Sequence, residues 1–169
     1  DALERGLLVG EIVVELLRRR LGAHAATAVQ PDPVAAREYL GDSPFIMFLG
    51  DNLIKDSLKP LVDRFEKERP AALLLLAEVA HPSSFGVVEL SGERIIRLVE
   101  KPKVPPSNLA LVGVYLFDKR IFDVIPKLKP SWRSELEITE AIQLLVDGGY
   151  VILHQKIEQW WKDTGRKED

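Results

Sequence analysis

The sequence predicts an α/β fold in one domain, built on a mixed, mainly parallel sheet with flanking helices. Three observations predict it: an unbroken apolar run at 44–49, a helix-periodic stretch at 57–69 and a second apolar run at 71–79. Apolar runs without polar alternation are typical of strands that are covered on both faces. A strand, a helix and a strand in this order form a βαβ unit, which gives a parallel pair.

The helix at 57–69 is the clearest of these elements. Its apolar residues share one helical face: Leu58, Leu61, Val62 and Phe65. Pro60 falls in the first turn, where its missing N–H costs little, and Pro70 ends the helix. This stop favours a buried strand, rather than a second helix, for the run at 71–79.

The middle of the chain predicts further strands. The segments 85–90 and 94–100 are expected to pair as a hairpin whose tight turn contains Gly92. The segment 101–108 contains three prolines and is expected to be a loop. The apolar run at 109–117 is expected to be another strand.

Two more helices and a final strand are predicted after that run. Asp118 is expected to cap a helix with an apolar face formed by Ile121, Phe122, Ile125 and Leu128. Ser134 and Glu137 fit a capping box, and the helix after them has an apolar stripe formed by Ile138, Ala141, Ile142 and Leu145. The glycines at 148–149 end this helix, and 151–156 is expected to be a short strand.

The first forty residues leave two interpretations open. Residues 12–14 form a short strand followed by a helix at 15–21, or the whole segment 12–21 forms one helix. Periodicity does not choose between them. A loop is expected at 30–33 and a short helix at 35–40.

The amino-acid composition excludes several classes of protein. The chain has 169 residues, 46% of them hydrophobic and 29% charged, as expected for a soluble globular domain. The net charge of −3 gives no footprint for nucleic-acid binding. Cysteine is absent, which excludes disulfides and thiolate metal sites and suits a cytoplasmic protein. No segment has the length of a membrane span or the pattern of a signal peptide.

Two acidic residues are candidates for chemistry. Asp51 directly follows the apolar run at 44–49, and ligands of open α/β sheets bind outside the carboxyl ends of strands. Asp51 is therefore a candidate metal ligand or substrate anchor, with an ordinary turn acid as the alternative. Asp163 is the second candidate, with a helix cap or a turn acid as its alternative.

Six short motifs follow one another along the chain: GDN at 50–52, FGVV at 85–88, VEKP at 99–102, VGVY at 112–115, ELEIT at 135–139 and WKDTG at 161–165. Together they resemble the sugar-phosphate nucleotidylyltransferases, most closely the longer type of glucose-1-phosphate thymidylyltransferase. The closer match rests on 106–115 and 129–135, and the resemblance covers 30–165. It implies a Rossmann-like fold of the nucleotide-diphospho-sugar transferase type.

The resemblance also implies a reaction. A sugar 1-phosphate oxygen attacks the α-phosphorus of a nucleoside triphosphate, giving a nucleotide sugar and pyrophosphate. Glucose 1-phosphate and dTTP are the expected substrates and Mg²⁺ the expected cofactor, since hard oxygen ligands suit this cation. By resemblance, Asp51 and Asp163 hold the Mg²⁺, and Lys101 neutralises the sugar phosphate.

The resemblance assigns substrate contacts to six more residues: Gln30, Asn52, Gly86, Glu100, Val112 and Gly113. Glu100 is expected to accept hydrogen bonds from sugar hydroxyls, Asn52 to touch sugar or phosphate, and Gln30 to read the nucleobase. Gly86 would let the backbone approach the sugar. Val112 and Gly113 would line the pocket through their backbone groups.

Each assignment has a structural alternative. Glu100 and Lys101 could form a surface ion pair, Gly86 a bulge, Asn52 a helix cap, and Val112 part of the core. Gln30 could be an ordinary polar loop residue. The tandem residues Trp160 and Trp161, and Trp132, suggest sugar stacking, but half-buried packing at a domain edge is favoured. The three histidines show no metal-ligand spacing.

The chain departs from the family pattern. It contains no G-x-G pattern, so the glycine-rich loop that grips the triphosphate is absent. Shortening is also expected after Val14 and after 30–33, and the carboxy-terminal domain of the longer type is missing. Residues 1–169 are therefore expected to be an incomplete catalytic domain, either truncated or lacking mobile loops. The second explanation is favoured, because the losses fall where ligand-binding loops would be mobile.

Rival functions stay open. The same fold serves uridylyl-, guanylyl- and adenylyltransferases, and loss of the triphosphate loop would suit a non-catalytic sugar-phosphate-binding or regulatory module. A metal-dependent glycosyltransferase is disfavoured, because Gly50-Asp51-Asn52 is not an Asp-x-Asp pair. No oligomeric state follows from the sequence, although the apolar stretch 138–146 would suit a core or a homo-oligomer interface.

Overall fold

The computed structural model describes residues 12–16, 25–28, 37–38 and 40–164. Its strands are β1 (Ile12–Leu16), β2 (Ala25–Ala28), β3 (Phe45–Leu49), β4 (Asn52–Ile54), β5 (Ala72–Glu78), β6 (Gly86–Ser91), β7 (Arg94–Glu100), β8 (Leu109–Phe117), β9 (Ile152–Lys156) and β10 (Trp161–Asp163). Its helices are α2 (Lys59–Glu68), α3 (Ile121–Val124) and α4 (Ile138–Asp147), with 3₁₀ turns at Pro82–Ser84 and Ile125–Lys127. Gln30, the loop at 30–33 and most of the short helix expected at 35–40 lie outside the described residues.

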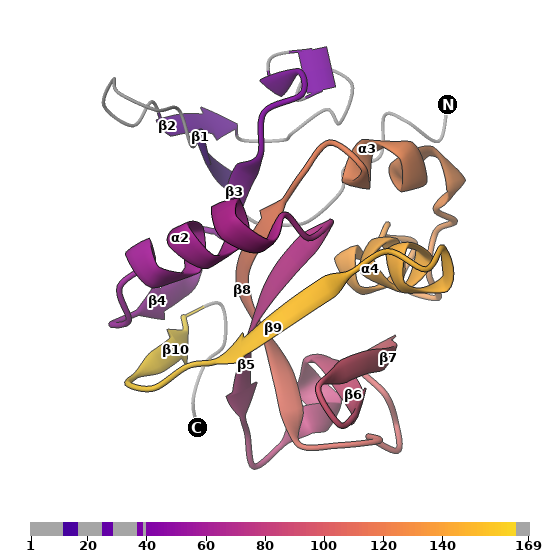
Figure 1. Cartoon of the computed structure of the whole chain (residues 1–169). Helices are drawn as coiled ribbons and strands as arrows, with labels where there is room; N and C mark the ends of the chain where they lie inside the picture. Colours follow the sequence, from indigo (N-terminus) through magenta and orange to yellow (C-terminus); the bar gives the residue numbers. More distant parts are fainter. Residues whose placement is uncertain (1–11, 17–24, 29–36, 39, 165–169) are drawn as a thin grey trace.

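The main sheet is mixed, as the sequence predicts, but the expectation that it is mainly parallel is wrong: among its described strand pairs only β5–β9 is parallel, and the others are antiparallel. Its strands follow the order β2-β1-β3-β8-β5-β9, and the β6–β7 hairpin joins it through β8 (Figure 1). β8 is antiparallel to both β3 and β5, whereas β5 and β9 are parallel. β3 and β5 therefore run in the same direction but do not pair directly, because β8 lies between them. The expected βαβ unit exists, but its two strands are not neighbours.

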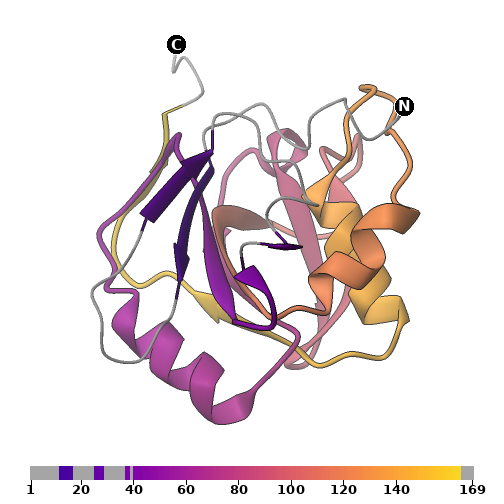
Figure 2. The ribbon, with the colours of Figure 1, turned by 90° about the horizontal axis from the view of Figure 1, so that it is seen from above.

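Each face of the sheet has its own core. On one face Met47, Leu74 and Tyr115 pack with the buried residues of α3 and α4. On the other face the alternate residues Ile46, Leu73 and Leu116 pack with Leu61 and Phe65 of α2. Figure 2 shows α2 on one side of the sheet and α3 and α4 on the other. This three-layer arrangement is the one that strands buried on both faces require.

Several predicted boundaries are confirmed. α2 has Pro60 in its first turn and ends at Arg69, which adopts a left-handed φ of 49°. The β6–β7 hairpin turns through Gly92 at φ 60°, and α4 ends before Gly149 at φ 76°. Left-handed angles of this kind favour glycine, which explains the last two positions.

The amino-terminal region resolves one open alternative. Residues Ile12–Leu16 form β1, so the single helix at 12–21 is wrong and the strand interpretation holds. β1 pairs antiparallel with both β2 and β3. Val14 and Glu15 are consecutive residues of this strand, and the shortened segment expected after Val14 stays a prediction. The part of the predicted helix beyond Leu16, at 17–21, lies outside the described residues.

The capping predictions before α3 and α4 are wrong. Ser134 does not cap α4: its φ is 60°, and the residue at the N-cap is Glu137, whose side chain caps nothing. Glu137 instead accepts a hydrogen bond from the Ser131 hydroxyl at 2.7 Å. Asp118 accepts the backbone N–H of Arg120, which is itself the residue before α3. None of the described helices is long and apolar enough to cross a membrane.

Candidate functional site

A cavity of about 280 Å³ opens where β3, β6, β7 and β8 meet the small β4–β10 sheet. Seven of the nine residues assigned by the sequence line it: Asp51, Asn52, Gly86, Glu100, Lys101, Gly113 and Asp163. They come from five separate segments of the chain. The sequence therefore predicts a set of residues that the fold brings into one place.

The two-stranded β4–β10 sheet brings the two aspartates together. β4 and β10 lie side by side (Figure 1). Asn52 and Asp163 are register partners in this antiparallel pair, so Asp51 lies opposite Thr164 at its end. Both the backbone N–H and the hydroxyl of Thr164 donate to the Asp51 carbonyl oxygen, at 2.7 and 2.8 Å. The two carboxylates consequently line the same cavity from neighbouring strands.

Asn52 connects three parts of this region. Its Oδ1 accepts the backbone N–H of Gly113 at 3.1 Å and the indole N–H of Trp161 at 2.7 Å. Its Nδ2 donates to Asp51 Oδ1 at 2.8 Å. The side chain is buried, with the residue only 6% exposed. Asn52 therefore does not cap the following helix, which was its structural alternative.

Gly113 is required by this buried amide. A Cβ at this position would overlap the Asn52 side chain, with Cγ at 2.7 Å. Gly86 has a comparable packing reason, since a Cβ there would lie 2.5 Å from Thr139 Cγ2. Both glycines line the cavity, and both also allow the surrounding side chains to approach the backbone closely.

Glu100 and Lys101 lie at the end of β7 and both reach the cavity. Consecutive strand residues point to opposite faces, but Lys101 leaves the strand with a left-handed φ of 40°. Its Nζ lies 3.8 Å from Glu100 Oε1. Backbone conformations of this kind cost free energy in non-glycine residues and cluster at functional sites.

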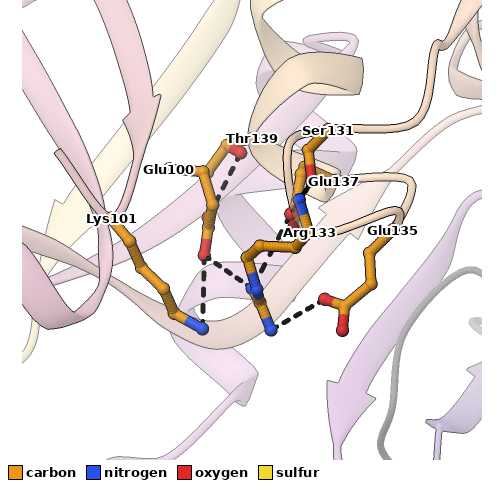
Figure 3. A network of polar contacts seen from close by, with 7 residues as sticks. All are labelled: Glu100, Lys101, Ser131, Arg133, Glu135, Glu137 and Thr139. Atoms are coloured by element: carbon orange, nitrogen blue, oxygen red, sulfur yellow. Dashed lines mark hydrogen bonds and ion pairs between the residues drawn. The ribbon is translucent and has the colours of Figure 1, made fainter.

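A network of charged side chains surrounds Glu100 (Figure 3). Glu100 Oε2 accepts a hydrogen bond from the Thr139 hydroxyl at 3.2 Å, and Oε1 lies 3.7 Å from Arg133 Nη1. The same Arg133 nitrogen lies 3.7 Å from Glu137 Oε1, while Nη2 contacts Glu135 Oε2 at 2.7 Å. Arg133 thus lies among three carboxylates on one side of the cavity.

Burial changes the acidity of two cavity groups. It raises the pKa of Glu100, and the Glu137 carboxylate adds to the rise, while Lys101 and the other partners oppose it. Burial likewise raises the pKa of Tyr115, with the charges of Glu100 and Asp51 adding to the effect. The phenol therefore stays neutral at physiological pH.

Two assigned residues are not part of this cavity. Val112 is fully buried in the core on the α2 side, on the opposite face of β8, so core packing, its structural alternative, describes it. Gln30 lies outside the described residues. Trp161 does more than pack at an edge, because it lines the cavity; its ring centroid lies 5.4 Å from that of Phe85, with the two rings tilted by 58°. Trp160 and Trp132 are 49% and 83% exposed.

Sequence reasoning assigned no part in the site to four residues of the network: Arg133, Glu135, Glu137 and Thr139. The signal was available, because all four lie within the 129–139 region that carries part of the resemblance. Glu135 and Glu137, at spacing two, share a face of the extended segment before α4, and Thr139 lies in the first turn of that helix. Acidic residues at this spacing next to Arg133 could have indicated a charged network at this position.

The cavity suits a magnesium ion held by few protein ligands. No group of three potential ligand side chains occurs among the described residues. Mg²⁺ commonly binds through one or two carboxylates and completes its shell with water and substrate phosphate oxygens. Asp51 and Asp163 supply two hard oxygen donors in one cavity, and the Asn52 N–H orients the first of them. The donor set therefore fits this ion.

Comparison with known proteins agrees with the geometry. Residues 7–169 match the family described as nucleotidyl transferase. The low-salt glycan biosynthesis nucleotidyltransferase Agl11 of Haloferax volcanii is 47% identical over 79% of this chain and 38% of its own length. A glucose-1-phosphate thymidylyltransferase of Streptomyces antibioticus is 44% identical over 97% of this chain and 50% of its own length. The chain thus spans half or less of the length of these relatives.

Solved structures show the same fold. A Bacillus anthracis protein assigned as a glucose-1-phosphate thymidylyltransferase, in complex with sucrose, has a TM-score of 0.70 and 37% identity, over 78% of this chain and 53% of that one. A UDP-glucose pyrophosphorylase in complex with UDP-glucose has a TM-score of 0.67 and 26% identity, over 77% of this chain and 54% of that one. The mixed sheet with its flanking helices is therefore the Rossmann-like fold of these enzymes.

Proposed function

The chain belongs to the nucleotidyl transferase family, and from this premise we propose that it transfers a nucleotidyl group from a nucleoside triphosphate to a hexose 1-phosphate. The products are a nucleotide sugar and pyrophosphate. Glucose 1-phosphate and dTTP are the proposed substrates, as in the Streptomyces relative's name. The observation that supports this most is one cavity lined by Asp51, Asp163, Glu100 and Lys101.

The charge of the cavity supports a metal-dependent reaction. Its lining carries five carboxylates against two cations, Lys101 and Arg133, which leaves a formal charge of −3 with all groups ionised. Two anionic substrates would be repelled by this surface. Mg²⁺ held by Asp51 and Asp163 would supply the positive charge that brings the phosphates in. Residues 1–169 would then be part of the catalytic domain of the protein.

The residues of the chain act mainly by positioning. The sugar phosphate oxygen is already anionic, so forming its bond to the α-phosphorus needs no protein base. The bond from that phosphorus to the β-phosphate bridging oxygen breaks, and pyrophosphate carries the electron pair away. Lys101 would neutralise the sugar phosphate, and Glu100, oriented by Thr139, would accept from sugar hydroxyls.

Substitution of the two aspartates tests this function. Asp51→Asn and Asp163→Asn should each lower the rate of pyrophosphate release about 100-fold or more, because charge neutralisation at the phosphates is lost. Asp63→Asn, an exposed acid on α2, is the matched control. Release of pyrophosphate at the unchanged rate in either variant, at saturating Mg²⁺, would contradict the proposal.

A non-catalytic sugar-phosphate-binding module is the second candidate, favoured by the absence of a G-x-G pattern in the sequence. Isothermal titration separates the two. The enzyme should bind a nucleoside triphosphate as well as the sugar phosphate, whereas the module should bind only the latter. Product analysis with dTTP and UTP then decides between thymidylyl and uridylyl transfer.

A further inference from the structure

We propose that Asn52 is a positioning residue, which fixes the carboxylate of Asp51 through a side-chain amide locked by Gly113 and Trp161. The inference rests on the function proposed above and changes the role of Asn52. In place of a contact to sugar or phosphate, it assigns Asn52 to the protein side of the site.

The chemistry of the two donors fixes the direction of the amide. A backbone N–H and an indole N–H can only donate, and both point at the same atom of Asn52. That atom must therefore be the carbonyl oxygen, and the amide nitrogen must face Asp51. Because Asp51 Oδ1 lies 2.8 Å from Nδ2, the carboxylate receives an N–H whose position is set by two other strands.

The surroundings leave the amide little freedom. Asn52 is buried, and its two anchors come from β8 and β10, which flank it on different sides. The absence of a side chain at Gly113 provides the space that the amide fills. Rotation of the amide would leave the buried Gly113 N–H and the partly buried Trp161 N–H without this acceptor, which costs about 1–3 kcal/mol for the buried group.

This arrangement separates positioning from substrate contact. Both accepting directions of the Asn52 oxygen are occupied by protein donors, so a sugar hydroxyl cannot donate to this oxygen. Groups that orient a metal-binding side chain typically change metal affinity 10- to 100-fold when they are removed. A substrate contact would instead change the affinity for the sugar phosphate.

Two substitutions in the complete encoded protein test the proposal. Asn52→Leu removes the amide but keeps the approximate volume, and Trp161→Phe removes the indole N–H and part of the ring volume while keeping an aromatic side chain. The matched controls are Asn108→Leu at an exposed position and Trp160→Phe at the half-exposed neighbour. Binding of Mn²⁺ alone is followed by its electron paramagnetic resonance signal. Sugar phosphate binding is followed by calorimetry without metal, and folding by thermal unfolding.

The expected result for Asn52→Leu is an increase of about tenfold or more in the Mn²⁺ dissociation constant. Its sugar phosphate affinity should stay within about twofold of the wild type. Trp161→Phe should weaken Mn²⁺ binding in the same direction but less, and it tests the proposal even where Asn52→Leu fails to fold. The controls should leave Mn²⁺ binding unchanged.

Two results would overturn the proposal in different ways. The positioning role is rejected if Mn²⁺ binding is unchanged in Asn52→Leu. Trp161→Phe decides by the same result where Asn52→Leu fails to fold. Weaker sugar phosphate binding in Asn52→Leu would instead make Asn52 a substrate contact. In that case Asp51→Asn should still lose Mn²⁺ binding and turnover. Unchanged Mn²⁺ binding and turnover in Asp51→Asn would instead reject the proposed function itself, and the positioning role with it.

Discussion

Two sides of the cavity are built from different interactions. The amide wall, formed by Asp51, Asn52, Gly113, Trp161 and Asp163, has side-chain hydrogen bonds of 2.7, 2.8 and 3.1 Å around one neutral group. The charged wall consists of Glu100, Lys101, Arg133, Glu135 and Glu137. Three of its ion pairs are 3.7–3.8 Å long, and only Arg133–Glu135 is short.

This difference indicates which wall of the cavity has a fixed geometry before a ligand binds. The amide wall has its donors and acceptors matched within the protein, so it holds a carboxylate in one place. In the charged wall most oppositely charged groups lie near one another without short contacts. An incoming anion can therefore pair with one of the cations while little interaction energy within the protein is lost. We therefore expect changes in the amide wall to affect turnover, and changes in the charged wall to affect binding and stability.

The largest effect is expected from Gly113→Ala. The added Cβ would displace the Asn52 amide, and a shift of about 1 Å at a reacting group costs about 100-fold in rate. Gly86→Ala is the matched control, because its Cβ meets the Thr139 methyl group instead. Both variants should lose about 1–3 kcal/mol of unfolding free energy. Equal losses of kcat in the two variants would contradict the expected difference between the amide wall and the charged wall.

Arg133→Met should have the next largest effect. Glu100, Glu135 and Glu137 would lose their shared partner, and a hydrogen bond to a charged group is worth about 2 kcal/mol. Urea unfolding at pH 7 measures the loss. Lys59→Met, which removes an exposed pair on α2, is the control and should cost much less. Similar losses in both variants would show that the network contributes little to stability.

A smaller effect is expected from Lys101→Met, and it should fall on binding. Loss of the cation proposed to neutralise the sugar phosphate should raise the dissociation constant of this substrate about tenfold, since the side chain is partly screened by solvent. Calorimetry at low and high salt measures the change, with Lys103→Met at an exposed position as the control. A loss of kcat without weaker sugar phosphate binding would show that Lys101 affects turnover, as expected for residues of the amide wall, and would contradict this prediction.

The smallest effect is expected from Glu100→Gln, and its sign depends on pH. The pKa of Glu100 is raised from 4.5 in the folded protein, so the folded state binds this proton more tightly than the unfolded state. Ionisation therefore lowers stability as pH rises from about 4.5 through the raised pKa. Glu100→Gln should unfold at a higher temperature than the wild type at pH 7, and the gain should vanish below pH 4.5. A gain that grows on acidification would contradict this sign.

The sequence predicted which segments form strands and helices better than it predicted which strands pair with one another. Apolar runs and helical periodicity located β3, α2, β5 and the β6–β7 hairpin, because these patterns are local. They did not place β8 between β3 and β5, since strand order depends on contacts between distant segments. The capping box failed because Ser134 took a left-handed conformation and Glu137 was drawn into the Arg133 network.

The candidate site was predicted through the motifs and refined by the contacts. Residues at strand ends, such as Asp51, Glu100 and Lys101, were identified because motif and position agreed. Val112 does not line the cavity and its side chain packs in the core on the α2 side, because a motif does not say which face of β8 a residue takes. The hydrogen bond from Trp161 to Asn52 joins two motifs that are distant in sequence, and only the fold shows it.

The pairing of β4 with β10 also sets the order in which the protein is completed during synthesis. Every strand of the large sheet precedes Trp161 in the chain, whereas the Trp161 indole, Asp163 and Thr164 come later. A nascent chain can therefore pack both faces of its sheet on the ribosome before the cavity is closed. Residues 157–160 tether β10 to β9, so β10 can dock on β4 once β9 is paired with β5. The cavity would then be completed only after the large sheet has formed.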